Sequence, residues 1–245
     1  MKKLQIALLG FGTVGKGVYE VVQSHQGTLK ATLGRSVEVS IILVENIHKH
    51  QDLAEQQLLT TDFQDVLNHP DIDVVCEAIV GTEPAATYLK KSLQAGKHII
   101  TANKEMFALH GKELKELAEA SGCQIGYEAT TGGGIPIIQT ISQLLKVNHI
   151  HKVSAILNGT SNYILSEMRN KGLSFDEALS QAQALGYAES DPVNDIEGFD
   201  SFYKLMILSD LIFNEQPDWN AVKRVGMTNV TADDINKLIQ VLLLN

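Results

Sequence analysis

The densest group of chemically useful side chains lies in residues 184–205, which read ALGYAESDPVNDIEGFDSFYKL. Its five carboxylates and one amine belong to Glu189, Asp191, Asp195, Glu197, Asp200 and Lys204. Carboxylates suit a bound ammonium group, and a lysine can exchange a proton with a reacting oxygen. By residue type alone, a solvated acidic loop is the simpler interpretation, because the glycines and the proline favour neither helix nor strand.

Two members of this stretch, Asp200 and Lys204, are four residues apart. If the sequence FDSFYKLMILSDLIF (199–213) forms a helix, both side chains project from one face. The alternative is an ordinary surface ion pair, worth a few tenths of a kcal/mol.

A second pattern with possible chemistry is GFGTVG at residues 10–15, which fits the spacing G-x-G-x-x-G. It directly follows an apolar run and opens a helical pattern, as a dinucleotide-binding turn requires. Gly10 would allow the tight turn, Gly12 the close approach of a pyrophosphate, and Gly15 the packing of helix on sheet. The turn predicts bound NAD or NADP, with a purely structural strand–helix turn as the alternative.

Glu45 is the candidate partner for the adenosine ribose, because an acidic residue is expected at the end of the second strand. It falls about ten positions later than the usual spacing of roughly 20 residues, and a long loop over residues 27–36 would absorb the difference. No arginine stands between Val44 and Asn46 to bind a 2′-phosphate. The sequence therefore favours NAD over NADP, unless Glu45 is merely an exposed loop acid.

The elements that must position these residues alternate between strand-like and helix-like patterns in the first half of the chain. The predicted strands are residues 4–9, 37–44, 73–80, 98–101 and 123–129. Such alternation predicts a parallel, doubly wound sheet of the Rossmann type with helices on both faces. Lys104 follows the strand 98–101, at the carboxyl edge where open α/β sheets bind ligands.

The pattern changes at the glycine-rich stretch TTGGGIP (130–136), so we place a domain boundary after residue 133. Residues 1–133 would form the dinucleotide-binding domain and residues 134–245 a smaller α+β domain. The second domain is predicted to contain a strand at 151–158 and helices at 137–146, 159–172 and 174–186.

Composition excludes several classes of function. A net charge of −9 argues against binding to a phosphate backbone, and no apolar run is long enough to span a bilayer. Cys76 and Cys123 are expected to be reduced structural thiols in a cytoplasmic protein. The eight histidines show no metal-ligand spacing.

Five stretches together closely resemble the homoserine dehydrogenase family and occur in that family's order. They are GFGTVGKGV, ITANKEMFA, YEATTGGGIPII, ILNGTSNYIL and LGYAESDPVNDIEGFDSFYKL. The resemblance covers residue 4 to about residue 210, and the last stretch is the most specific. It implies interconversion of L-aspartate 4-semialdehyde and L-homoserine with a nicotinamide cofactor, in a homodimer whose second domain binds substrate and forms the dimer.

The resemblance also implies roles for individual residues. Lys204 would be the general acid–base residue, and Lys104 a second active-site lysine near nicotinamide and substrate. Substrate binding would fall to Glu189, Asp195 and Asp200. Contacts to the cofactor would come from Gly10, Phe11, Gly12, Thr13, Val14, Gly15, Glu45, Thr101, Lys104 and Gly186.

The stretch YEATTGGG resembles the family's site for a monovalent cation, expected to be Na+. Glu128 would supply a side-chain oxygen, and Thr131, Gly133 and Ile135 backbone carbonyls. Oxygen ligands suit such a hard cation. The alternative is a plain flexible hinge.

The sequence departs from the family at its end, where the strands that complete the family's substrate domain do not follow. The second domain is therefore expected to be incomplete. Two interpretations remain open: an active dehydrogenase, or a truncated and catalytically feeble homologue that still binds dinucleotide. A third, another amino-acid dehydrogenase on the same scaffold, is disfavoured by the complete acidic motif.

Overall fold

The computed structural model describes residues 2–53, 55–231, 233–235 and 237. The chain divides into two compact units, residues 1–139 and 140–245. The division falls a few residues after the predicted boundary at residue 133.

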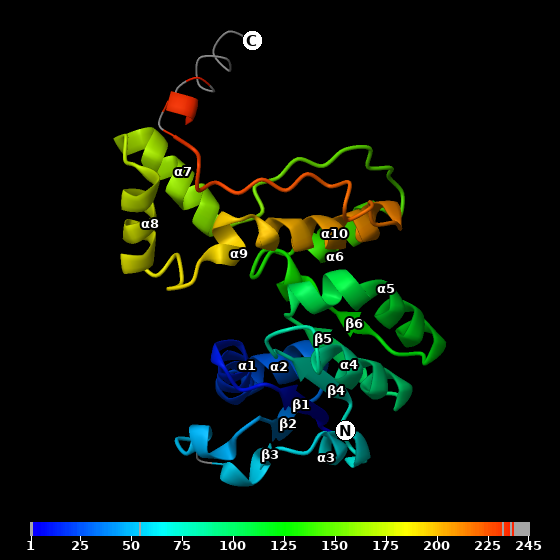
Figure 1. The fold of residues 1–245 in the computed structure, drawn as a ribbon. Coiled ribbons are helices and arrows are strands. Elements are labelled where there is room, and N and C mark those ends of the chain that lie inside the picture. The colour runs from blue at the N-terminus through cyan, green and yellow to red at the C-terminus, as the bar shows by residue number, and fades with distance from the viewer. Residues whose placement is uncertain (1, 54, 232, 236, 238–245) are drawn as a thin grey trace. The chain divides into compact units, whose positions relative to one another are not determined.

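The first unit is built on a six-stranded sheet in the order β3-β2-β1-β4-β5-β6, with every neighbouring pair parallel (Figure 1). The strands are β1 Leu4–Leu9, β2 Val37–Leu43, β3 Leu59–Thr60, β4 Val74–Glu77, β5 His98–Thr101 and β6 Ile125–Gly126. This order is the doubly wound one, in which the chain builds outward from β1 on one side and then returns to β1 on the other. The predicted parallel sheet is confirmed, although the last strand is much shorter than the predicted 123–129.

The helices of the first unit connect these strands. They are α1 Thr13–Ser24, α2 Gln26–Leu33, α3 Phe63–Asn68, α4 Ala85–Gln94 and α5 Lys104–Ala120, with short 3₁₀ turns η1 Ile47–His50, η2 Gln56–Leu58 and η3 Glu128–Thr130. α1, α2 and α3 contact β2, whereas α4 and α5 contact β5 and each other. The central strand β1 buries Ala7, Leu8 and Leu9 almost completely, as a parallel strand covered on both faces must.

One predicted loop is wrong. Residues 27–36 were expected to be irregular, but most of them belong to α2, which ends at Gly34 with a φ of +72°. Leu29, Lys30 and Ala31 are good helix formers, and a glycine in the left-handed conformation is a common helix end. The helix still lengthens the connection between α1 and β2, so the late position of Glu45 is accounted for.

The second unit is helical. Its helices are α7 Gly159–Lys171, α8 Phe175–Ala184, α9 Val193–Ile196 and α10 Phe199–Phe213, and α6 Ile137–Leu144 runs across the division between the units. α7 and α8 pack closely because Ala178 and Ala182 of α8 face Ile164 and Met168 of α7 in one buried cluster.

The strand predicted at residues 151–158 is absent, so the α+β description of the second unit is corrected to a helical one among the described residues. The segment has no regular structure, and residues 151–156 are exposed. A strand needs backbone hydrogen bonds from a neighbour. No described residue supplies them here, and the β-branched residues of HKVSAILN are not sufficient alone.

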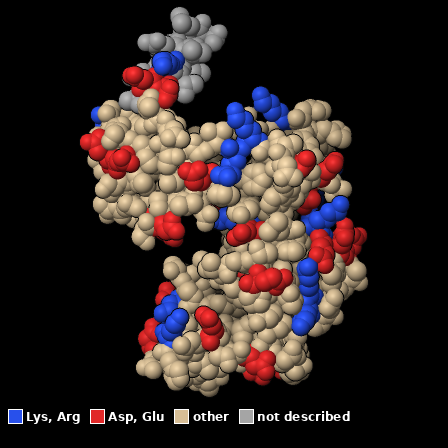
Figure 2. Space-filling model, in the orientation of Figure 1, with Lys and Arg blue, Asp and Glu red and all other residues tan. Residues whose placement is uncertain are grey.

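Surface charge and helix composition bear on possible partners. On the face shown in Figure 2, acidic and basic side chains are interspersed and no basic stripe crosses it. Among the described residues, no helix combines the length and the apolar character needed to cross a bilayer.

Candidate functional site

The glycine turn between β1 and α1 has the geometry that a bound phosphate requires. Gly10 has a φ of +91°, and a Cβ there would lie 2.7 Å from the Ala78 carbonyl oxygen. A Cβ on Gly15 would lie 2.2 Å from the Gly10 carbonyl oxygen, whereas one on Gly12 would meet nothing within 4 Å. Gly10 and Gly15 are thus required by close backbone contacts, and the space beside Gly12 is open for a ligand.

α1 begins immediately after this turn, and no described side chain caps its N-terminus at Gly12. Thr13 and Val14 form the first turn, and the N–H groups of such a turn and the helix dipole attract a pyrophosphate. The residues of the turn therefore fit a dinucleotide. Once bound, such a cofactor supplies a hydride at its nicotinamide ring.

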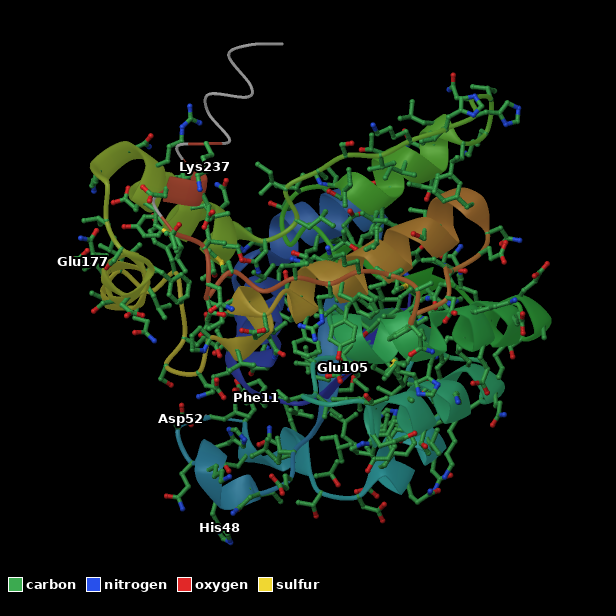
Figure 3. All side chains as sticks on the ribbon, turned by 45° about the horizontal axis from the view of Figure 1, so that its top comes forward. Phe11, His48, Asp52, Glu105, Glu177 and Lys237 are labelled. Atoms are coloured by element: carbon green, nitrogen blue, oxygen red, sulfur yellow. The ribbon has the colours of Figure 1, made fainter. Side chains whose placement is uncertain are left out.

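The side chain of Phe11, within the glycine turn, belongs to the core of the first unit. It is buried and packs edge-on against Tyr19, with ring centroids 5.8 Å apart. Lys16 lies with its ammonium 5.9 Å from the Phe11 ring centroid and 3.1 Å from Asp52 Oδ2. Phe11 and Asp52, the two residues that Lys16 contacts, are labelled in Figure 3. The side-chain hydrogen bond from Lys16 holds the pKa of Asp52 below its usual range.

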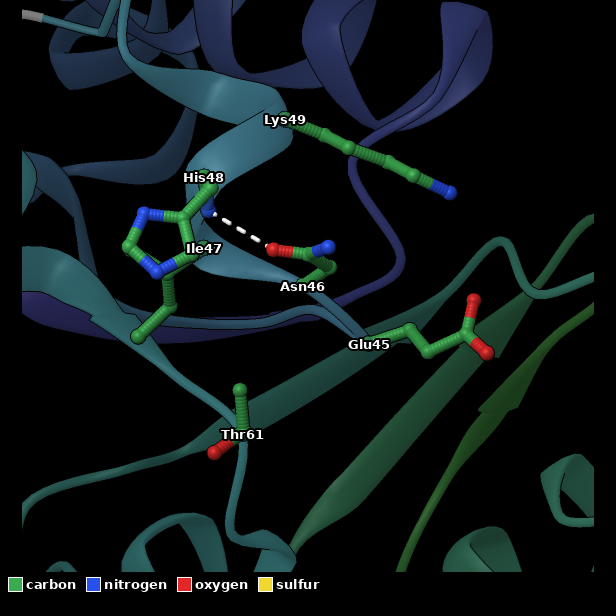
Figure 4. Close-up of a pocket in the computed structure, with 6 residues that line it drawn as sticks. All are labelled: Glu45, Asn46, Ile47, His48, Lys49 and Thr61. Carbon is green, nitrogen blue, oxygen red and sulfur yellow. Dashed lines mark hydrogen bonds between the residues drawn. The ribbon is translucent and has the colours of Figure 1, made fainter.

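Glu45 lies at the end of β2 beside a polar pocket of about 370 Å³. The pocket is lined by Glu45, Asn46, Ile47, His48, Lys49 and Thr61 (Figure 4). The Asn46 side chain accepts a hydrogen bond from the His48 backbone N–H at 2.9 Å and so starts η1. In Figure 4 the side chains of Glu45 and Lys49 extend to the same side, and the His48 ring lies on the other.

Thr101 lies at the end of β5, where it contacts an acid that the sequence analysis did not single out. Its hydroxyl donates a 2.5 Å hydrogen bond to Glu77 Oε2, and the Ile79 N–H donates to Glu77 Oε1 at 2.6 Å. Burial raises the pKa of Glu77, against the opposing effect of these hydrogen bonds. The sequence contained one indication of this acid, because Glu77 interrupts the otherwise apolar run VVCEAIV of a predicted strand.

Lys104 is the first residue of α5 and is positioned through Asn103. The Asn103 side chain accepts from the Met106 N–H at 3.0 Å and donates to the carbonyls of Ile79 at 3.1 Å and Gly81 at 2.7 Å. These bonds connect the loop after β4 to the start of α5. The sequence prediction that Lys104 lies at the carboxyl edge of the sheet is therefore confirmed.

The residues expected to bind a cation lie in η3 and in the segment between η3 and α6. The two oxygens of Glu128 accept hydrogen bonds from the backbone N–H groups of Ile138, at 2.8 Å, and Gln139, at 3.0 Å. Thr131 is buried, Gly133 has a φ of +59°, and Ile135 is exposed. Within the part of the chain that the structure describes, no three His, Cys, Asp or Glu side chains group as metal ligands.

In the second unit, Asn158 connects the acidic stretch to the start of α7. Its Nδ2 donates to Asp195 Oδ1 at 2.6 Å and to Asp200 Oδ2 at 2.9 Å. Its Oδ1 accepts from the Ser161 N–H at 2.7 Å, which caps α7. Asn158 lies in the stretch ILNGTSNYIL but was missed, because only the fold reveals that one amide contacts two carboxylates.

Lys204 completes this network. Its Nζ lies 2.8 Å from Asp200 Oδ2 and donates to the Leu157 carbonyl oxygen at 2.9 Å. The predicted pairing along α10 is confirmed, but the alternative of a surface ion pair is wrong, because the side chains of Asp200 and Lys204 are only 4% and 15% exposed.

Glu189 and Gly186 lie apart from this network, in the loop after α8. Gly186 has a φ of +78°, and Glu189 is exposed. Among the described residues, no hydrogen bond joins the Glu189 carboxylate to Asn158, Asp195 or Asp200. The structure therefore brings together two of the three predicted substrate ligands, together with Lys204.

Comparison with known proteins gives a consistent result over nearly the whole chain. The family model described as homoserine dehydrogenase, NAD binding domain, matches residues 10–128, and the one described as homoserine dehydrogenase matches residues 136–241. The homoserine dehydrogenase of Bacillus subtilis is 40% identical over 237 residues, which is 96% of this chain and 55% of that protein.

Comparison with solved structures points to the same family. A homoserine dehydrogenase from Thiobacillus denitrificans matches with a TM-score of 0.90 at 40% identity, over 98% of this chain and 56% of that one. A hyperthermophilic archaeal homoserine dehydrogenase in complex with NADPH matches with a TM-score of 0.81 at 25% identity, over 94% of this chain and 76% of that one.

The chain spans about half the length of the curated relatives it matches. The two family matches follow one another along the chain in the same order as the two units. The dinucleotide turn begins at the first residue of the NAD-binding match, and the buried Asp200–Lys204 pair lies within the second match. On this evidence, the chain belongs to the homoserine dehydrogenase family.

Proposed function

We propose that this protein interconverts L-aspartate 4-semialdehyde and L-homoserine with a nicotinamide cofactor. Residues 1–133 would bind the dinucleotide, and residues 134–245 would bind the substrate and form a homodimer. The observation that carries the proposal is the buried network in which Asn158 donates to Asp200 and Asp200 pairs with Lys204. A lysine held in this way is suited to proton exchange at one fixed place rather than to solvation.

The proposed chemistry assigns a distinct task to each group of side chains. Glu189 and Asp200 bind the ammonium group of the amino-acid substrate, which needs facing carboxylates, and Asp195 is a further substrate-binding residue. In the reducing direction, Lys204 Nζ gives a proton to the substrate oxygen as the C–O double bond is reduced. In the oxidising direction, Lys204 Nζ takes the hydroxyl proton back.

Lys104 is proposed as the second active-site lysine, and Thr101 and Gly186 as contacts of the cofactor. The pyrophosphate lies on the turn from Gly10 to Gly15, including Phe11, Thr13 and Val14, with Glu45 at the ribose. A cytoplasmic location, and no nucleic-acid or membrane partner, complete the proposal.

The direct test is steady-state oxidation of homoserine, followed by cofactor absorbance, with a panel of other hydroxy and amino acids as comparison. We expect turnover with homoserine well above turnover with the other compounds. Dinucleotide binding without turnover would instead identify a feeble homologue, and a better substrate in the panel would identify another amino-acid dehydrogenase.

Cofactor choice provides a separate prediction. A carboxylate can accept hydrogen bonds from ribose hydroxyls but repels a 2′-phosphate, so NAD should exceed NADP in kcat/KM by at least about tenfold, or ~1.4 kcal/mol. Lys49, which extends to the same side as Glu45, offsets part of this repulsion. Glu45→Arg should narrow or reverse the preference.

Glu116→Arg is a suitable control, because it makes the same charge change at an exposed position of α5. It should leave the preference between the cofactors unchanged. Equal kcat/KM values for NAD and NADP in the wild type would show that Glu45 does not contact the ribose.

The proposed Na+ site predicts that activity or Tm responds to the identity of the monovalent cation at constant ionic strength. Glu128→Ala should remove this response. The substitution also removes the cap that Glu128 provides for α6, which costs about 0.5–2 kcal/mol of stability in any salt. If Glu128→Ala lowers the Tm equally in every salt and still responds to the identity of the cation, Glu128 caps α6 and does not bind the cation.

A further inference from the structure

Glu77 is a buried acid with no part in the proposed chemistry. It ends β4, where its Cα pairs with Leu9 of β1 on one side and Thr101 of β5 on the other. The residue is only 2% exposed. An ionisable group at the carboxyl edge of an open sheet, on one of the two strands between which the order reverses, lies where such folds bind ligands.

Hydrogen bonds satisfy the carboxylate, but in the described part of the chain no positively charged side chain pairs with it. The Thr101 hydroxyl and the Ile79 N–H each donate to one oxygen. Among the described residues, no lysine, arginine or histidine forms an ion pair with it. Buried charges in proteins are normally paired. Burial raises the pKa of Glu77, because the ionised form loses contact with water.

Glu77 also faces a small cavity beneath the glycine turn. The cavity has a volume of about 90 Å³, and its lining includes Gly10, Gly15, Glu77 and Thr101 among mainly apolar residues such as Ile100. An apolar setting screens charge less than water does, so the field of an ionised carboxylate extends to a ligand seated on the turn.

The sheet order identifies which part of a dinucleotide would experience this field. The order reverses between β1 and β4, and a dinucleotide lies across that reversal. Glu45 ends the β2 side and is the candidate for the adenosine ribose. The nicotinamide half therefore belongs to the β4–β5 side, where Glu77 and Thr101 lie.

The two redox states of the cofactor differ at this half by one charge, because the nicotinamide ring is positive in the oxidised form and neutral in the reduced form. We propose that Glu77 is a positioning and electrostatic residue that selectively stabilises the oxidised cofactor. The inference rests on the proposed binding of a nicotinamide dinucleotide, but not on turnover of homoserine.

The test is the affinity of the protein for NAD+ and for NADH, each measured directly. NADH binding is followed by its fluorescence and NAD+ by competition, at alkaline pH so that the carboxyl group is ionised. In Glu77→Gln, which keeps the shape and removes the charge, the ratio Kd(NAD+)/Kd(NADH) should rise by about tenfold, the size expected for one partly screened charge. NADH affinity should change little.

Glu38→Gln is the matched control, because it removes an exposed carboxylate of the same unit that pairs with Lys3. Its ratio should equal that of the wild type. If Glu77→Gln binds both forms with an unchanged ratio, Glu77 is structural and the inference is wrong. If the wild type binds neither form, the proposed function fails as well, so the two failures can be distinguished.

A measurement on the wild type covers the case in which Glu77→Gln does not fold. Difference infrared spectra should show a change in a carboxyl band on addition of NAD+ that is absent with ADP-ribose, which lacks the nicotinamide ring, and absent with NADH. ADP-ribose also cancels any contribution from Glu45. Identical spectra for NAD+ and ADP-ribose would overturn the inference.

Discussion

Lys204→Ala is expected to lower the turnover of homoserine by about 10²–10⁴-fold, the usual contribution of a general acid–base group. The affinity for NAD should change little, since Lys204 lies in the second unit and forms its bonds with Asp200 and the Leu157 carbonyl. Steady-state kinetics and a separate titration of NADH fluorescence measure the two effects.

Lys204→Arg should not restore turnover. The guanidinium group keeps the positive charge but does not release its proton at neutral pH. Lys171→Ala, which removes an exposed lysine of α7 paired with Glu167, is the control and should retain activity. Near-normal turnover in Lys204→Ala would show that Lys104 or water, and not Lys204, exchanges the proton with the substrate.

Asp200→Ala is expected to have the second largest effect, about 2–5 kcal/mol in kcat/KM for homoserine. Two causes combine. The substrate ammonium loses a carboxylate, and Lys204 and Asn158 both lose a buried partner. Removing one member of a buried pair leaves an unbalanced charge, so the Tm should also fall.

Glu189→Ala separates the two causes, because Glu189 is exposed and joins no hydrogen bond of the Asn158 network. It should weaken the use of homoserine far more than cofactor binding and leave the Tm near that of the wild type. Wild-type kinetics in both variants would show that these carboxylates do not bind substrate.

Local patterns were sufficient for much of the first unit. The G-x-G-x-x-G spacing and the apolar runs predicted the turn and the strands. Gly15 lies against the nearby Gly10 carbonyl, and a strand that is buried on both faces of a parallel sheet has a continuous apolar run as its local pattern. The pairing of Asp200 with Lys204 was predicted for the same reason, because helical spacing alone brings them together.

Local patterns were insufficient where the secondary structure of a segment depends on partners that are distant in the sequence. The β-branched residues of 151–158 suggested a strand, but a strand forms only beside another extended segment, and none of the described residues provides one. Conversely, residues 27–36 were predicted to be a loop, although most of them belong to α2, which buries none of its residues.

The sequence by itself determined the chemistry available to this protein: a glycine turn for a dinucleotide, and carboxylates with a lysine at helical spacing. Tertiary structure alone decided which polar groups are buried together. Asn158 meets Asp195 and Asp200 across 37 and 42 residues of chain, and Glu77 meets Thr101 across 24. Burial and hydrogen-bond partners at such separations follow from how the elements pack, which no local pattern of residues encodes.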